Sequence, residues 1–382
     1  MMELSDSRVL IVDDVKANID ILVQALSGDY KLSVAIGGQQ ALDAVRRAPP
    51  DLVLLDIVMP DIDGYEICRR LRAAEPTREL PIMFLSSLED VHDKTRGFEV
   101  GGNDYLTKPF EILEVKARVR SLLKAKAYAE AVKAAAERDL RIAREIQMGL
   151  LPADIAAQTR GTGLDVHALL EPARQVGGDL YEVLRLGPDR VLVAVGDVSG
   201  KGIPAALFMA VTMTLLRNLA RQGHSPQEIL RQLNDELLEQ NPRGMFVTLQ
   251  CLVFDLARRT VTCASAGHHA VIRVAADGSP EFAFTSSGRV LGLLPAEPID
   301  SECIELRPGD TFLLYTDGVS EAFGTDDELF GDDRLQAHLA ASPGRSARET
   351  TAGVLEAVRQ HAADVPQSDD ITVLSVCYPG RA

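Results

Sequence analysis

The stretch LVLLDIVMPDIDG at residues 52–64 joins a short apolar run to an aspartate, Asp56, and then to a turn rich in Pro, Asp and Gly. Other short apolar runs lead into polar residues in the same way, and amphipathic segments separate them: VLIVDD at 9–14, PIMFLSS at 81–87 and DYLTK at 104–108. Strands that alternate with helices are typical of a parallel sheet covered on both faces. We therefore predict a doubly wound α/β domain over residues 1–124.

The composition excludes several classes of protein. A chain of 382 residues has room for two or three domains, and 46% hydrophobic with 25% charged residues is a globular balance. The net charge of −16 disfavours a nucleic-acid partner, because phosphates would be repelled. No uninterrupted apolar run approaches about 18 residues, so we expect neither export nor a membrane span. The five scattered cysteines lack a C-x-x-C pair, which indicates reduced thiols in the cytoplasm and no zinc site.

Residues 111–150 predict one long helix. They contain no Pro and no Gly before Gly149, and they are rich in Ala, Glu, Arg, Lys and Leu. We expect Gly149 and Pro152 to end the helix. The apolar seam between Leu122 and Leu150 steps by three and four with one extra step of four, which fits a coiled-coil dimer with a stutter. A solitary amphipathic helix lying on a neighbouring domain fits equally well.

The chain changes character after Leu151. Runs such as VLVAVGD at 191–197 and DITVLSVCY at 370–378 alternate like strands, with helical patterns at 203–222, 226–240 and 346–363. Hairpin signals dominate this half, so we predict an antiparallel α+β domain. The expected organisation is a first domain at 1–124, a helical linker at 125–152 and a second domain at 153–382.

Polar side chains follow the predicted parallel strands at the point where each strand ends. They are Asp13, Asp14, Asp56, Ser86 and Lys108. The carboxyl ends of parallel strands meet in one crevice, and clustered carboxylates there suit Mg²⁺. One aspartate would then attack a phosphoryl donor, while the hydroxyl and the ammonium bind the new phosphate oxygens. A single aspartate at a strand end is more often a turn or helix cap, but the whole set indicates a site.

The same residues resemble the receiver domain of bacterial response regulators over residues 7–124. The matching motifs are Asp13-Asp14, Leu54-Leu55-Asp56 with Met59-Pro60 and Gly64, Ser86, and Tyr105-Leu-Thr-Lys-Pro-Phe110. The resemblance implies a sensor histidine kinase as partner, Asp56 as the phosphorylated residue and a cis peptide bond before Pro109. It also implies a receiver metal site and a switch: Mg²⁺ on Asp13, Asp14, Asp56 and the Val58 carbonyl, with Ser86, Tyr105 and Lys108 as switch residues.

The segment GDVSGKG at 196–202 invites comparison with a nucleotide-binding P-loop, because it lies between an apolar strand and a helix. The pattern fails. A P-loop needs G-x-x-x-x-G-K-[ST], whereas only three residues separate Gly196 from Gly200, and Gly202 replaces the required hydroxyl. A nucleotide cyclase or NTPase output is therefore disfavoured.

Aspartates recur beside Gly or a second Asp at four predicted strand ends of the second domain. The pairs are Gly178-Asp179, Gly196-Asp197, Asp317-Gly318 and Asp369-Asp370. Glycine lets the backbone turn tightly, so the carboxylates can approach a shared point. Oxygen ligands without His or Cys indicate a pair of Mg²⁺ or Mn²⁺ ions, which suits hydrolysis of phosphate esters. Any one Asp-Gly pair alone is more often a β-turn.

These motifs resemble PPM-type protein serine/threonine phosphatases of the bacterial SpoIIE/RsbU group over residues 140–378. The matching segments are REIQ at 144–147, LLP at 150–152, ARQVGGD at 173–179, GDVSGKG at 196–202, AGH at 266–268, PGD at 308–310, YTDGV at 315–319 and SDDIT at 368–372. The resemblance implies a four-layer α-β-β-α sandwich. It also implies that two Mg²⁺ or Mn²⁺ ions are held by Asp179, Asp197, the Val198 carbonyl, Asp317 and Asp369.

Three further residues are candidates for the phosphatase site. Asp370 is a possible additional ligand. Arg174 either contacts the substrate phosphate or forms a surface salt bridge. Glu182 stands where the family pattern has Asp, and its longer side chain alters the bonds behind the metal ligands.

The joined parts imply a response regulator whose output is a metal-dependent phosphatase, controlled through the linker by phosphorylation of Asp56. By resemblance, the substrate is a phosphorylated anti-sigma-factor antagonist of the STAS type in a partner-switching pathway, and the chain is a cytoplasmic homodimer with no nucleic-acid or membrane partner. The alternative is a phosphorylation-dependent adaptor that only binds a partner protein. Retention of four mutually repelling aspartates argues against the adaptor.

Overall fold

The computed structural model describes residues 4–87, 97–239, 241–284, 288–295, 298–341 and 344–380. The chain forms two compact units, Met1–Glu137 and Arg138–Ala382. The border between them lies inside one long helix, α5 (Ile112–Leu150).

The first unit is built on a parallel five-stranded sheet with strand order β2-β1-β3-β4-β5. The strands are β1 (Arg8–Val12), β2 (Lys31–Ala35), β3 (Leu52–Asp56), β4 (Ile82–Ser86) and β5 (Asp104–Thr107). Every residue of β3 and β4 is buried, which explains their continuous apolar sequence. The predicted doubly wound parallel sheet is confirmed.

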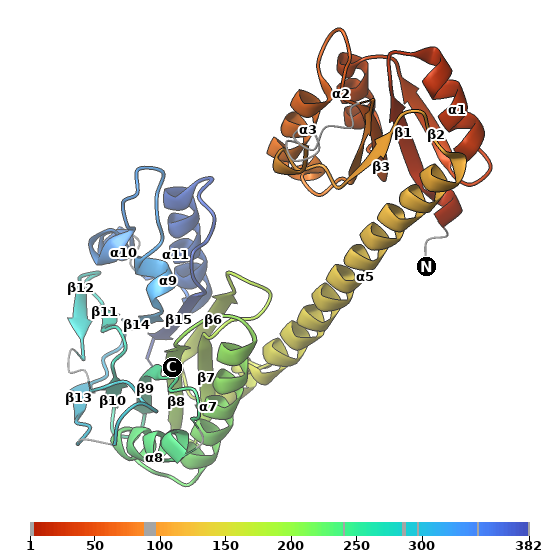
Figure 1. Ribbon diagram of the computed structural model, residues 1–382. Helices are drawn as coiled ribbons and strands as arrows, with labels where there is room; N and C mark the ends of the chain where they lie inside the picture. Colours follow the sequence, from red (N-terminus) through yellow and green to blue (C-terminus); the bar gives the residue numbers. More distant parts are fainter. Residues whose placement is uncertain are drawn as a thin grey trace. The chain divides into compact units, whose positions relative to one another are not determined.

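Helices cover both faces of this sheet (Figure 1). One face packs against α1 (Lys16–Leu26) and the first turns of α5. The other packs against α2 (Gly38–Arg47) and α3 (Gly64–Ala73). Two short 3-10 turns, η1 (Leu4–Asp6) and η2 (Glu75–Thr77), complete the described elements of this unit.

Helix α5 runs unbroken for 39 residues, which confirms the predicted long helix. It continues one residue past Gly149, and Pro152 follows its end. Its first turns are anchored by the buried residues Val115, Val119 and Leu123. Residues 127–139 are exposed in every turn. The coiled-coil dimer and the solitary helix both stay predictions.

The second unit contains two antiparallel five-stranded sheets, with orders β13-β10-β9-β8-β7 and β12-β11-β14-β15-β6. The strands of the first are β7 (Leu180–Arg185), β8 (Arg190–Val198), β9 (Val247–Asp255), β10 (Thr260–Ala266) and β13 (Ser301–Glu305). Those of the second are β6 (Asp165–Glu171), β11 (Val271–Val274), β12 (Pro280–Ala283), β14 (Asp310–Tyr315) and β15 (Ile371–Tyr378).

Helices lie outside both sheets, so the unit has four layers (Figure 1). The first sheet is covered by α7 (Ile203–Arg221) and α8 (Pro226–Glu239), and these helices share one core with both sheets. The second sheet is covered by α9 (Asp317–Ser320), α10 (Gly331–Ala340) and α11 (Ala347–Ala362). A short helix, α6 (Ile155–Thr159), precedes β6. The predicted α-β-β-α sandwich is confirmed.

One helix in the described part of the chain, α7, has the length and apolar character of a membrane span. Its buried residues, among them Met209, Met213 and Leu216, belong to the core between α7, α8 and the first sheet. Its hydropathy is therefore that of a core helix.

Candidate functional site

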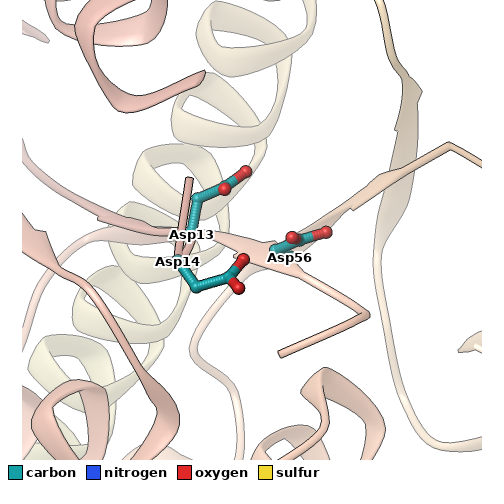
Figure 2. A group of neighbouring side chains, drawn as sticks. All are labelled: Asp13, Asp14 and Asp56. Carbon is teal, nitrogen blue, oxygen red and sulfur yellow. The ribbon is translucent and has the colours of Figure 1, made fainter. Parts of the chain in front are cut away.

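Three carboxylates meet at the carboxyl ends of β1 and β3 in the first unit. Asp13 and Asp14 follow β1, and Asp56 ends β3, which is paired with β1. One ligand oxygen from each lies within 4.8 Å of the others, and Figure 2 shows the three side chains together. Asp13 and Asp56 are buried, whereas Asp14 is exposed. This set of hard oxygen ligands at one open edge fits Mg²⁺.

Lys108 supplies a positive charge to the same cluster. Its ammonium lies 2.7 Å from Asp13 Oδ2 and 2.9 Å from Asp56 Oδ2. Burial raises the pKa of Asp56, although the contact with Lys108 opposes that rise. For Lys108, burial acts to lower the pKa, but hydrogen bonds to Asp13 and Asp56 outweigh it and the pKa is raised. The peptide bond between Lys108 and Pro109 is cis, as predicted.

The other expected receiver residues surround this cluster. Ser86 is buried at the end of β4, and its carbonyl accepts a hydrogen bond from the Lys108 amide at 2.7 Å. Tyr105 is buried in β5, where its ring packs on Phe84 and Phe98 at centroid distances of 5.3 and 5.5 Å. Val58 lies two residues beyond Asp56, with its side chain in solvent. Thus the structure holds Tyr105 in an inward position.

Sequence reasoning missed Asn18, which holds Asp13 from the first turns of α1. The Asn18 amide donates to both oxygens of Asp13 at 3.0 Å, and the Val15 amide donates to Oδ1 at 2.8 Å. The only available signal was an amide side chain five residues after Asp13.

The five aspartates of the second unit come from segments that belong to both sheets. Asp179 precedes β7 and Asp197 lies near the end of β8, in the first sheet. Asp317 begins α9 directly after β14, while Asp369 and Asp370 precede β15, in the second sheet. The two sheets therefore bring them to one edge of the sandwich.

Hydrogen bonds join the two sheets at this edge. Asp179 is buried, and its Oδ2 accepts from the Thr316 hydroxyl at 2.7 Å and the Thr372 hydroxyl at 2.5 Å. The Thr372 amide donates in turn to the Thr316 hydroxyl at 3.0 Å. Because Thr316 precedes Asp317, this network fixes residues 179 and 317 relative to each other.

Burial, and after it the charges of neighbouring carboxylates, raise the pKa values of Asp179, Asp197 and Asp317. Burial raises the pKa of Asp197 to about 7, and the charges of Asp317, Asp369 and Asp370 add to the rise. Burial and the Asp197 charge raise the pKa of Asp179 well above its ordinary range. Burial and the Asp369 charge raise the pKa of Asp317 as well. Bound cations would relieve this repulsion, so the chemistry of the donor set fits divalent metals.

The phosphatase carboxylates are spaced more widely than those of the receiver. Among the described residues, Asp13, Asp14 and Asp56 are the one group of three potential metal-ligating side chains whose ligand atoms all lie within 4.8 Å. A wider set matches two ions better than one, since paired metal ions lie about 3.5–4 Å apart.

Two glycines permit the close approach of backbone and carboxylates. A Cβ on Gly178 would lie 2.5 Å from the Val198 carbonyl oxygen and 3.1 Å from Asp197 Oδ1. A Cβ on Gly318 would lie 1.9 Å from the Asp370 carbonyl oxygen. Any larger residue at either position would push these segments apart. The Val198 carbonyl oxygen and the Asp197 carboxylate both lie next to Gly178.

Asp370 has both oxygens engaged by backbone amides. Oδ1 accepts from the Ala173 amide at 2.8 Å, and Oδ2 accepts from the Gly178 amide at 2.7 Å. Asp369 instead forms an ion pair with Lys201 at 2.8 Å, and both side chains are partly exposed. Asp370 thus holds the loop before β7, whereas Asp369 faces the acidic edge beside a surface lysine.

Glu182 and Arg174 lie in different surroundings. Glu182 is buried and forms an ion pair with Arg217 of α7. Arg217 also donates to the Leu150 carbonyl at 2.5 Å, at the end of α5. Arg174 is exposed and makes no ion pair with a carboxylate of the described chain, so the expected surface salt bridge is absent there.

Two further residues support the site without having been assigned a role from sequence. Gln147, in the last turns of α5, donates to the Gly177 carbonyl at 2.6 Å and accepts from the Gly177 amide at 3.2 Å. His268 contacts the Thr248 hydroxyl at 2.8 Å and the Tyr315 carbonyl at 3.1 Å. Burial lowers the pKa of His268 to about 3, so the ring is neutral. In the sequence, the REIQ motif at 144–147 pointed to Gln147 and the AGH motif at 266–268 pointed to His268.

A family model described as Stage II sporulation protein E (SpoIIE) matches residues 187–379, just over half of the chain. The chain belongs to the SpoIIE family. A model of the response regulator receiver domain matches residues 9–120. This SpoIIE-family chain is therefore a response regulator with a SpoIIE-type phosphatase output domain, and the family resemblance seen in the sequence is confirmed.

Curated relatives share one or both parts with this SpoIIE-family chain. Protein IcfG of Synechocystis sp. (strain ATCC 27184 / PCC 6803 / Kazusa) is 25% identical over 402 residues, covering 96% of this chain and 58% of that protein. Response regulator PleD of Caulobacter vibrioides (strain NA1000 / CB15N) is 32% identical over 198 residues, covering 50% of this chain and 42% of that protein. The chain spans about half the length of the curated relatives it matches.

Solved structures share the fold of the second unit. The SiaA-PP2C domain of Pseudomonas aeruginosa gives a TM-score of 0.58 at 24% identity, covering 64% of this chain and 98% of that chain. The PP2C phosphatase domain of SpoIIE from Bacillus subtilis, with a fragment of its regulatory domain, gives a TM-score of 0.50 at 19% identity. The match covers 56% of this chain and 63% of that chain. These likenesses show a PP2C-type fold.

Proposed function

We propose that the second unit hydrolyses phosphoserine or phosphothreonine in a partner protein. Two Mg²⁺ or Mn²⁺ ions would be held by Asp179, Asp197, Asp317, Asp369 and the Val198 carbonyl. The observation that carries the proposal is the gathering of carboxylates from two sheets at one edge, where burial and then the charges of Asp317, Asp369 and Asp370 raise the pKa of Asp197 to about 7. Bound cations would relieve that repulsion while leaving the carboxylates ionised.

The chain's own residues would position the ions and the substrate. Bound divalent ions would supply an activated water and neutralise phosphate oxygens. The hydroxyls of Thr316 and Thr372 orient Asp179. Asp370 holds the loop before β7 through two backbone amides. Arg174, exposed on that loop, is available for a substrate phosphate.

The first unit would control this activity through phosphorylation of Asp56 by a sensor histidine kinase. Its Mg²⁺ would be held by Asp13, Asp14, Asp56 and the Val58 carbonyl. Lys108 lies 2.9 Å from Asp56 and is placed to bind the new phosphate oxygens. Ser86 and Tyr105 would be the switch residues, with Tyr105 starting from the inward position described above.

Helix α5 is the proposed link between the two activities, within a homodimer joined through residues 125–152. The proposed domain limits are 1–124 for the receiver and 153–382 for the phosphatase. Gln147 near the end of α5 holds Gly177, which adjoins the loop bound by Asp370. A rotation of α5 would therefore act directly on the loop that carries Asp179.

Membership of the SpoIIE family supports a STAS-type anti-sigma-factor antagonist as the substrate, in a cytoplasmic partner-switching pathway. The proposal therefore rests on family membership for the pathway and on the acidic edge for the reaction.

Hydrolysis of p-nitrophenyl phosphate and of a phosphoserine protein, each with Mn²⁺, tests the enzyme. We expect the full chain to be active and Asp317→Ala to lose nearly all activity with the fold intact by circular dichroism. Equal rates for both proteins would reject catalysis at this edge, and the phosphorylation-dependent adaptor would remain as the explanation.

Control by the receiver is tested with beryllofluoride, which mimics the phosphoryl group on Asp56. We expect it to change the phosphatase rate of the wild type, and to leave Asp56→Ala unchanged. Gln147→Ala should respond less than the wild type. An identical response in all three proteins would reject the coupling.

A further inference from the structure

A pocket of about 130 Å³ lies beside the proposed catalytic edge, lined by residues of α9, of α11 and of the loop at 363–368. Figure 1 shows where α9 and α11 lie in the second unit. Gly318 and Ser368 line it, and they are the chain neighbours of Asp317 and Asp369. Consecutive Cα atoms lie about 3.8 Å apart, so the pocket wall begins one residue from two proposed metal ligands. The residues next to a phosphoserine bound at that edge can reach this pocket.

The pocket is mainly apolar. Its charged lining residues, Glu171 and Arg359, pair with each other at 2.6 Å and so offer little net charge to an occupant. Gln367 is also engaged, since its amide donates to the carbonyls of Glu171 and Asp369. The apolar lining residues include Ala322, Phe323, Val358, Ala362, Val365 and Ile371.

Its size suits one aliphatic side chain. A protein cavity of about 150 Å³ with an apolar lining accommodates benzene, and this pocket of about 130 Å³ is slightly smaller. Phe323, one of its walls, is 42% exposed. An entering Leu, Ile or Met side chain would therefore bury apolar surface on both partners.

One wall of the pocket carries a strained backbone turn. Ala363 has φ 47° and ψ −111°, and the Val365 amide donates to the Ala362 carbonyl at 2.8 Å. This is a type II′ turn with alanine at the position that favours glycine. Backbone strain of this kind concentrates at functional sites. The turn sets the shape of the pocket beside Asp369.

We infer that this pocket binds one apolar side chain of the phosphoprotein substrate, at a position within two residues of the phosphoserine or phosphothreonine. The inference rests on the proposed function and adds the means of substrate selection. Recognition is by fit of an aliphatic side chain next to the acidic edge. An acidic side chain at that position is rejected, because the nearby carboxylates repel it.

Two capped phosphoserine peptides test the inference on the full chain with Mn²⁺. They are identical except for Leu or Gly on both sides of the phosphoserine. We expect kcat/KM for the Leu peptide to be at least about tenfold higher, through a lower KM, since small apolar groups in a fitted pocket give about 10–200-fold discrimination. p-Nitrophenyl phosphate, which has no flanking residues, reports the catalytic edge alone.

Variants locate the effect in the pocket. Ala362→Leu fills it and should abolish the preference for the Leu peptide, while hydrolysis of p-nitrophenyl phosphate and of the Gly peptide stays unchanged. Ala352→Leu, exposed on the same helix, is the matched control and should behave as the wild type. Phe323→Ser removes one wall and should weaken the preference without introducing bulk.

The outcomes separate the two proposals. If the wild type hydrolyses p-nitrophenyl phosphate but treats both peptides alike, the pocket inference is wrong and the proposed function stands. If p-nitrophenyl phosphate is not hydrolysed, both fall. A preference for Leu that survives both Ala362→Leu and Phe323→Ser would also overturn the inference, because the selection would then arise elsewhere.

Discussion

The acidic centre of the receiver and that of the phosphatase balance their charges differently. The receiver draws three carboxylates from the ends of two neighbouring parallel strands and places Lys108 within 2.9 Å of two of them. The phosphatase draws its carboxylates from two sheets, and the ammonium of Lys201, which pairs with Asp369, is partly exposed. The first centre thus contains its own counter-charge, whereas the second would obtain its counter-charge from the metal ions proposed above.

The two centres also differ in how deeply their charged groups are buried. In the receiver, Asp13 and Asp56 are buried and both form ion pairs with Lys108. In the phosphatase, Asp197 is only half-buried, yet its pKa is raised to about 7 by burial and by three other carboxylates. Removing a ligand or a cation should therefore affect the second centre more than the first.

The largest effect is expected for Asp197→Asn. The change removes a proposed ligand shared with the other phosphatase carboxylates, and loss of partners outside the ligand shell alone costs about 10–100-fold. Hydrolysis of p-nitrophenyl phosphate should fall by more than about 100-fold, while phosphorylation of Asp56 is unaffected. Activity within a few-fold of the wild type would show that Asp197 holds no essential metal.

A pair of lysine changes tests the difference in counter-charge. Lys108→Met removes an ammonium that contacts two buried carboxylates, so acceptance of a phosphoryl group from a small acyl phosphate should fall by about tenfold. Lys201→Met removes a partly exposed pair, which contributes little, and should change the phosphatase rate by no more than about twofold. If both variants lost activity by the same factor, the two centres would not differ in their dependence on a lysine counter-charge.

A smaller effect is expected on the pH dependence of stability in metal-free buffer. The folded chain holds a proton on Asp197 up to about pH 7, whereas the unfolded chain releases it near the ordinary value of 3.8. Raising the pH from about 6 to about 8 therefore removes stability from the wild type. In calorimetry with EDTA, the wild type should lose melting temperature relative to Asp197→Asn over that range. Parallel curves would show that Asp197 titrates normally.

The smallest effect is expected at the strained turn. Ala363→Gly relieves a positive φ that costs about 1–2 kcal/mol in alanine, less the added flexibility of glycine in the unfolded chain. The net gain should be about 0.5–1 kcal/mol in the unfolding of the phosphatase unit by urea. Ala352→Gly, in the exposed middle of α11, should instead lose about 1 kcal/mol. A loss at both positions would argue against strain at Ala363.

The fold and the main acidic residues were accessible from sequence for a physical reason. Strand ends in a parallel sheet must share one edge, so the grouping of Asp13 with Asp56 followed from the alternation of apolar runs and helices. The phosphatase aspartates were found by motif resemblance, because the antiparallel order of ten strands cannot be read from local patterns.

The contacts that support the sites were not accessible in the same way. Glu182 and Arg217 are 35 residues apart, and Gln147 and Gly177 are 30 apart. Such pairs depend on how helices pack on a sheet, which no local spacing encodes. The inward position of Tyr105 is similar, since it is set by ring packing on Phe84 and Phe98.

The proposed coupling through α5 makes the number of residues between Val115 and Gln147 matter. Each residue of an α-helix turns the chain by about 100°. One residue inserted among the exposed positions 127–139 would therefore swing the amide of Gln147 by more than a quarter of a revolution, whereas seven would return it almost to its starting direction. The proposed coupling should therefore tolerate an insertion of seven residues better than an insertion of one.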